Sequence, residues 1–72
     1  MDEFFLIWSE SKQKWIVLFA DGRMLNYGYG SCGEAEIVAM KHANEITKKE
    51  RGQAGWEITE NTGTFLRYEA AA

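Results

Sequence analysis

One uncharged apolar run constrains the fold of this chain more than any other part of its sequence. Residues 15–20 read Trp-Ile-Val-Leu-Phe-Ala, and Asp21 and Gly22 follow directly. β-Branched and aromatic residues favour a pleated strand, and an Asp-Gly pair is typical of a two-residue type I′ turn. The sequence therefore predicts a central β-strand that enters a tight hairpin, with residues 23–27 folding straight back along it.

The length of the chain allows one small domain, residues 1–72. A chain of this size buries only about 60% of the surface that its unfolded form exposes, so every large apolar side chain matters for stability. Three Trp, three Tyr and four Phe residues are present, and each aromatic side chain buries a large area. We therefore expect a globular domain with an aromatic core.

Two further patterns complete the predicted order of elements, ββ(β)αββ. A period of two is typical of strands, whereas a capped run with a period near 3.6 is typical of a helix. The expected fold class is α+β, an antiparallel sheet of four to five strands with one helix. The expected elements are strands over residues 3–9, 14–20 and 23–27, a helix over 33–51, and a second hairpin with strands over 56–60 and 64–69.

The predicted helix carries signals at both of its ends. Ser31, followed three residues later by Glu34, forms a capping-box pattern at the start, and Gly52 supplies a stop at the end. Positive side chains suit the negative end of a helix dipole. Three basic residues fall there: Lys48, Lys49 and Arg51.

The helix should lie on the sheet through one stripe of mostly small residues. At 100° per residue this stripe comprises Ala35, Ala39, His42, Ala43 and Ile46. Ile37 and Met40 fall nearer the opposite side of the helix. We expect both to be exposed and to offer apolar contacts.

A single helix covers only one face of a sheet, yet the first two predicted strands are apolar on both faces. Either the sheet curls into a small barrel that packs its aromatic side chains internally, or a second subunit or a partner protein covers the second face. We expect a protein partner or a homodimer. The residues predicted to contact it are Phe5, Ile7, Ile16 and Leu18 on the sheet, with Ile37 and Met40 on the helix.

Three glycines match the letters of a dinucleotide-binding fingerprint, Gly28-x-Gly30-x-x-Gly33. That fingerprint requires a parallel βαβ unit, whereas the preceding elements here form an antiparallel meander. Glu34 and Glu36 also place negative charge where a phosphate would bind. We therefore expect these glycines to serve the geometry of the loop.

The sequence contains no pattern typical of catalysis or metal binding. Cys32, at the predicted helix start, is expected to have a depressed pKa. His42 lies ten residues further along the same helix, about 15 Å away at about 1.5 Å per residue, which rules out a Cys-His dyad. No metal-ligand spacing occurs. We expect no enzyme activity, no catalytic residue, no metal and no cofactor.

Charge and cysteine content indicate the surroundings of the protein. Eleven acidic against eight basic residues give a net charge of −3, which opposes adhesion to nucleic acid or to an anionic membrane. A single cysteine forms no intramolecular disulfide, and neither a signal peptide nor an apolar run of about 18 residues is present. We expect a soluble, cytoplasmic protein without a membrane partner.

An alternative is a small nucleic-acid-binding module. Lysine and arginine contact phosphates, and exposed aromatic rings stack on bases, although the acidic balance of the chain disfavours this partner. The residues of this alternative are Lys12, Lys14, Tyr27, Tyr29, Lys48, Lys49 and Arg51.

From Phe4 to Trp56 the chain faintly resembles WGR domains, in which a Trp-Gly-Arg-x-Gly segment follows an aromatic strand pair. The matching segment here is residues 27–33. Tyr27 stands where the family has its Trp, and Tyr29 stands where the family has the Arg that carries its link to nucleic acid. The nucleic-acid function of that family is therefore not carried over to this chain.

Together these patterns predict a small non-catalytic protein that acts by binding a protein partner or itself. An acidic protein of this size without a catalytic constellation is typical of a regulator or inhibitor, such as a phage or mobile-element protein that blocks a host enzyme. Acidic side chains would then help by facing a basic partner.

Overall fold

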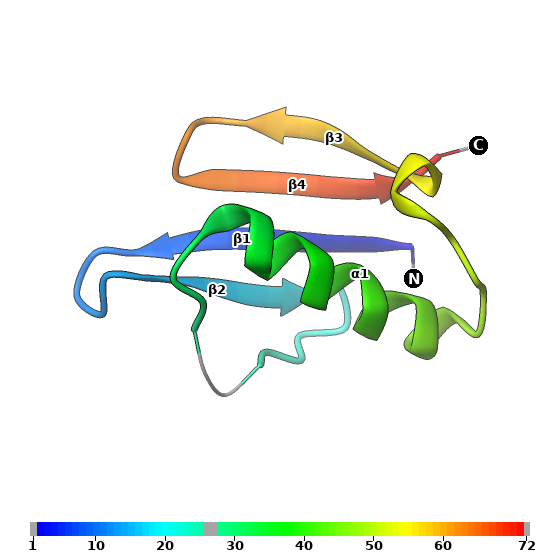
Figure 1. The fold of residues 1–72 in the computed structure, drawn as a ribbon, viewed down its shortest axis with the longest axis horizontal. Helices are drawn as coiled ribbons and strands as arrows, with labels where there is room; N and C mark the ends of the chain where they lie inside the picture. Colours follow the sequence, from blue (N-terminus) through cyan, green and yellow to red (C-terminus); the bar gives the residue numbers. More distant parts are fainter. Residues whose placement is uncertain (1, 26–27, 72) are drawn as a thin grey trace.

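Residues 2–25 and 28–71, which a computed structural model describes, form one helix packed on one face of a four-stranded sheet (Figure 1). This arrangement confirms the predicted α+β class. The elements are β1 (Glu3–Ser9), β2 (Lys14–Phe19), α1 (Cys32–Thr47), the short 3₁₀ turn η1 (Gln53–Gly55), β3 (Trp56–Asn61) and β4 (Phe65–Ala70).

The sheet joins the two predicted hairpins edge to edge. Its strand order is β2-β1-β4-β3, and every neighbouring pair is antiparallel. Phe4 in β1 is the ladder partner of Phe19 in β2 and of Tyr68 in β4. Because ladder partners share a face of the sheet, one row of aromatic side chains crosses three strands.

The turn after β2 differs from the expected two-residue type I′ turn. Gly22 has a positive φ of 92°, whereas Asp21 does not. The Phe19 amide donates to the carbonyl of Arg23 at 2.8 Å, and the Gly22 amide donates to the carbonyl of Phe19 at 2.9 Å. These bonds enclose residues 20–22, a three-residue loop with its glycine in the bulge position. The hairpin is confirmed, but its predicted turn type was wrong.

The segment after this turn folds back along β2 without forming a continuous strand. Met24 makes an isolated bridge with Leu18, and Tyr29 makes another with Trp15. Residues 26–27, the remainder of the predicted third strand, lie outside the described residues. The segment therefore shields the outer edge of β2 at two points.

Gly28 is required where this segment crosses β2. A Cβ atom at this position would lie 2.7 Å from the Cβ of Lys14, which is too close. Gly30 and Gly33 have open space at the same position. The role of Gly28 is therefore close backbone approach, as expected for the loop.

The helix begins as predicted and ends early. Ser31 accepts a hydrogen bond from the Glu34 amide at 3.2 Å, which confirms the predicted N-cap. The end, however, is Thr47 rather than Arg51, because Lys48 adopts a left-handed conformation with φ 57°. No basic residue lies in the last turn of α1, but Lys48 is its C-cap and Lys49 follows directly, so these two predicted cations lie just past the helix end.

Contacts of Arg51 with the second hairpin explain the early end of α1. Its guanidinium lies 5.2 Å from the centre of the Trp56 ring and 3.2 Å from the Asp2 carboxylate. The Asn44 side chain donates to the Arg51 carbonyl at 2.7 Å and accepts from the Trp56 indole at 3.3 Å. A longer helix would carry Arg51 away from these partners.

The core lies between α1 and one face of the sheet. Phe4 is fully buried between the stacked ring of Tyr68, 4.6 Å away, and the edge-on ring of Trp56, 5.0 Å away. Small residues of the predicted stripe meet these rings, and the buried set is Phe4, Leu6, Val17, Phe19, Tyr29, Ala35, Ala39, Met40, Ala43, Trp56, Leu66 and Tyr68.

Candidate protein-interaction face

The face of the sheet opposite α1 carries large apolar side chains, and we call it the open face. Strand alternation turns Phe4 and Leu6 toward the helix and therefore turns Phe5 and Ile7 away from it. Their ladder partners share this orientation. The resulting apolar patch comprises Phe5, Ile7, Ile16, Leu18 and Phe65, all half-buried.

The apolar patch is continuous across three strands. Phe5 is paired with Leu18, and Ile7 is paired with Ile16 on one side and Phe65 on the other. The rings of Phe5 and Phe65 also approach each other, with centres 5.6 Å apart. β2 and β3 are not ladder partners in the described residues, so the sheet stays open instead of curling into a barrel over this patch.

Charged residues adjoin the patch on the same face. Glu3 is paired with Glu69, Glu69 with Glu57, and Arg67 with Glu60. Arg67 lies 2.6 Å from the Glu3 carboxylate and 3.5 Å from that of Glu69, and the hydrogen bonds that Arg67 donates to Glu3 raise the pKa of Arg67. We call the four carboxylates, Glu3, Glu57, Glu60 and Glu69, the acidic band.

The helix residues of the predicted contact set lie on the other side of the sheet. Ile37 is 60% exposed, as expected, but Met40 is buried at 8%. Met40 lies one turn after Glu36, whose carboxylate bonds to Tyr68 of β4, so this flank of α1 faces the sheet. The expected exposure of Met40 was wrong, and Ile37 belongs to a surface separate from the open face.

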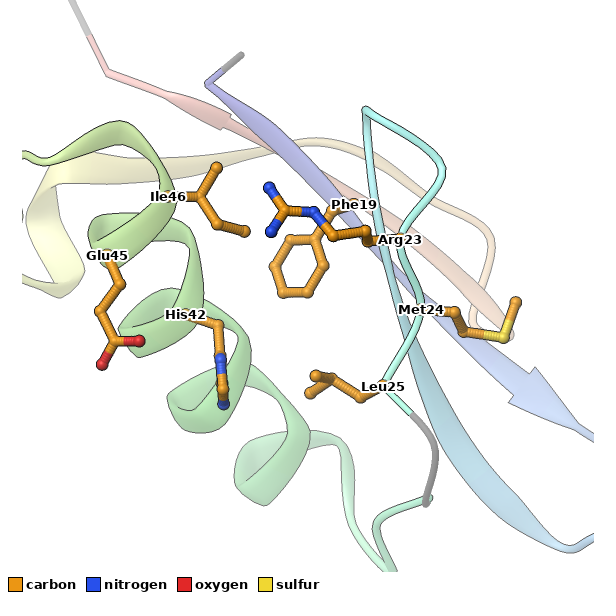
Figure 2. A pocket seen from close by; sticks show the side chains of 7 residues that line it. All are labelled: Phe19, Arg23, Met24, Leu25, His42, Glu45 and Ile46. Carbon is orange, nitrogen blue, oxygen red and sulfur yellow. The ribbon is translucent and has the colours of Figure 1, made fainter.

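A hollow lies between α1 and the turn after β2. It has a volume of about 370 Å³, and Figure 2 shows the side chains around it. They are Phe19, Arg23, Met24, Leu25, His42, Glu45 and Ile46.

An ion pair lies beside this hollow. Arg23 bonds to Asp21 at 2.6 Å, and the backbone amide of Arg23, followed by its side chain, lowers the pKa of Asp21. Figure 2 shows the Arg23 guanidinium near the Phe19 ring, whereas Glu45 extends away from it. The hollow is therefore lined mostly by apolar side chains, and its lining residues do not bring a nucleophile together with a base.

Cys32 lies beside a carboxylate and a phenol rather than beside a base. The Tyr68 hydroxyl donates to Glu36 at 2.5 Å, and burial together with this bond raises the pKa of Tyr68. Burial, and then the charge of Glu36, raise the pKa of the Cys32 thiol. The expected depression of this pKa was wrong, because burial and the charge of Glu36 together outweigh the hydrogen bond with Tyr68, which lowers the pKa. Activated cysteines instead have a thiol pKa that is lowered.

Cys32 should therefore react with iodoacetamide only at a higher pH than the same thiol in an unfolded peptide. The folded chain binds the thiol proton more tightly than the unfolded chain does. The protonated thiol therefore contributes its full stabilisation of the fold below about pH 8.5, and this contribution is lost as the pH rises through the raised pKa. The alkylation rate against pH, followed by mass spectrometry, measures this. Glu36→Gln removes one cause and should move the curve part of the way back. If the midpoint pH of the alkylation curve lay at or below that of the unfolded peptide, the raised pKa of Cys32 would be wrong.

Tyr29 and Arg51, the described aromatic and arginine residues of the nucleic-acid alternative, are not arranged for stacking on bases. Tyr29 is buried at 6% exposure, and Tyr27 lies outside the described residues. Arg51 is held against Trp56 and Asp2. An exposed stacking platform is therefore not formed by the described members of this set.

The lysines of this alternative lie in two separate places. Lys12 and Lys14 are at the turn between β1 and β2, whereas Lys48 and Lys49 follow the last residue of α1. Figure 1 shows these two places at opposite ends of the long axis of the molecule. The two lysine pairs therefore do not lie together on one phosphate-binding surface.

The described residues also form neither a metal-binding cluster nor a membrane-spanning helix. Among residues 2–25 and 28–71, no group of three or more His, Cys, Asp or Glu side chains could hold a metal ion. None of the helical segments in that part of the chain is long and apolar enough to cross a membrane. Comparison with protein-family models, curated proteins and solved structures finds no match to this chain, so its function has to be inferred from its own geometry.

Proposed function

We propose that this chain is a small non-catalytic interaction module that binds a protein partner through the open face. The observation that supports the proposal is the apolar patch, in which five large side chains adjoin one another on a face that no other described element covers. Contiguous apolar surface of this kind marks interaction sites in proteins of known function.

The size of the face suits a protein interface. The two longest dimensions of the molecule are 34 and 23 Å, and Figure 1 views the sheet along the third. These dimensions bound a face of about 800 Å², which is the area that each partner contributes to an interface of standard size. The patch supplies an apolar centre, and the acidic band supplies a polar rim, as interfaces commonly have.

The finer hypothesis is a regulator or inhibitor, of the kind that phages and mobile elements use against host enzymes. It is supported by the net charge of −3, together with the raised pKa of Cys32 and a 370 Å³ hollow that brings no nucleophile together with a base. A nucleic-acid partner is favoured less, because the two lysine pairs lie at opposite ends of the molecule.

Substitution of one ladder pair in the centre of the patch tests the proposal. Ile7→Thr with Ile16→Thr keeps β-branched residues in both strands and removes apolar surface from the open face. Capture of protein from a nuclease-treated lysate should fall by about tenfold or more, because central apolar contacts dominate binding. Circular dichroism checks the fold.

The matched control is Ile37→Thr with Ile58→Thr, since both side chains are exposed elsewhere, at 60% and 48%. This control should capture protein as the unsubstituted chain does. Equal capture by both double variants would contradict the proposal, as would an unsubstituted chain that captures nothing and stays monomeric in light scattering.

A further inference from the structure

We propose that the open face receives a protein segment in which apolar side chains are flanked by lysine or arginine. This inference rests on the proposed function and adds the chemistry of the partner to it. It is carried by the acidic band, which adjoins the apolar patch on the same face of the sheet.

The acidic band is unfavourable in the isolated chain. Glu69 faces Glu3 on one neighbouring strand and Glu57 on the other, and like charges directly opposite each other destabilise a sheet. In the described residues, Arg67 is the cation that forms ion pairs with the band. One guanidinium among four carboxylates leaves an excess of negative charge, which attracts a cation from a partner.

The band and the patch are close enough for one short segment to contact both. Phe5 is paired with Leu18 on one side and with Arg67 on the other. Glu3 lies two residues before Phe5 on the same face of β1, a distance of about 7 Å along a strand. Alternate side chains of an extended partner segment have the same spacing, so an apolar residue and a basic residue two positions apart match Phe5 and Glu3.

A second copy of the chain supplies too few cations for this face. In the described residues, Lys14 lies at the other end of the open face, where it is paired with Ser9, and Lys12 lies in the adjoining turn. Two copies stacked end over end would bring at most these two lysines to the four carboxylates of the band. Two copies stacked side over side would bring one band against the other, and like charges across an interface oppose association.

Selection from a random peptide library on the immobilised full chain tests the inference. Peptides that combine apolar residues with Lys or Arg should be enriched. When resynthesised, they should bind a Glu57→Gln, Glu60→Gln variant about tenfold more weakly, because an ion pair at the edge of the apolar contact is lost. The matched control is Glu10→Gln with Glu50→Gln, which removes the same charge from exposed positions elsewhere and should bind normally.

The outcomes separate this inference from the proposed function. Peptides that lose binding to the Ile7→Thr, Ile16→Thr variant but are not enriched in Lys or Arg overturn the inference alone. Peptides that bind this variant with the same affinity as they bind the unsubstituted chain overturn both the inference and the proposed function. A dimer in light scattering that the same variant breaks would assign the face to a second copy, and the basic partner would be wrong.

Discussion

Phe4→Ala is expected to lower the free energy of unfolding by about 3–5 kcal/mol. The ring is fully buried, and it contacts the rings of Tyr68 and Trp56, so its removal opens a cavity at the meeting point of three strands. A domain of 72 residues has a total stability of about 4–11 kcal/mol at about 0.05–0.15 kcal/mol per residue. A large fraction of the variant should therefore be unfolded without urea, or its unfolding midpoint should lie at a much lower urea concentration than that of the unsubstituted chain.

Phe5→Ala is the matched control, because it changes the same residue type one position along the same strand. Phe5 lies on the open face and is half-buried, so its loss should cost about 1 kcal/mol. Urea unfolding of both variants, followed by far-ultraviolet circular dichroism, measures the difference. Equal destabilisation would show that the open face is covered within the molecule, which would also remove the basis of the proposed interface.

Ala39→Leu should lower the free energy of unfolding by about 1–3 kcal/mol. Ala39 is fully buried, on the face of α1 that packs against β1 and β2. The sheet presents large rings such as Phe4 on this side, so the small side chain lets the helix lie close. Three more heavy atoms at this position would push α1 away from the sheet or force strained side-chain conformations.

Lys41→Leu controls for the effect of adding a leucine to the helix, because Lys41 is exposed on the opposite side. Its effect should stay within about 0.5 kcal/mol. Thermal unfolding of the two variants measures the contrast. If Ala39→Leu unfolded at the same temperature as the unsubstituted chain, the close approach of α1 to the sheet would be wrong.

Local signals in the sequence were sufficient to predict most elements of this fold. Alternation and turn residues placed β1 at residues 3–9 and β2 from Lys14, both as observed. Ser31 marked the helix start correctly. These features depend on neighbouring residues alone, which is why the sequence reveals them.

Features that depend on distant contacts were not predicted. The end of α1 is set by Arg51 packing on Trp56, and a helix pattern contains no information on that contact. Met40 was expected to be exposed because helix periodicity places it off the buried stripe. Its flank of α1 faces β4 through the bond between Glu36 and Tyr68, and the pattern alone does not reveal which strand lies there.

The candidate site was predicted in part, because some of its residues follow from alternation within one strand and others depend on how the strands pair. Strand alternation identified Phe5, Ile7, Ile16 and Leu18 as a second apolar face, and the register of β1 with β2 places them together. Phe65 and the acidic band join this face through the pairing of β1 with β4. That pairing requires the strand order, which alternation within single strands does not specify.

The central position of β1 also determines how the chain must fold. Each hairpin forms from neighbouring residues within microseconds, about 1–10 μs, but the two halves meet only when β1 finds β4. The bond between Arg67 and Glu3 joins residues that are 64 positions apart. Closing so long a loop costs entropy that either hairpin alone does not recover. An isolated two-stranded hairpin is marginally stable in water, so we expect the chain to fold in one cooperative step whose rate is set by the encounter of the two hairpins.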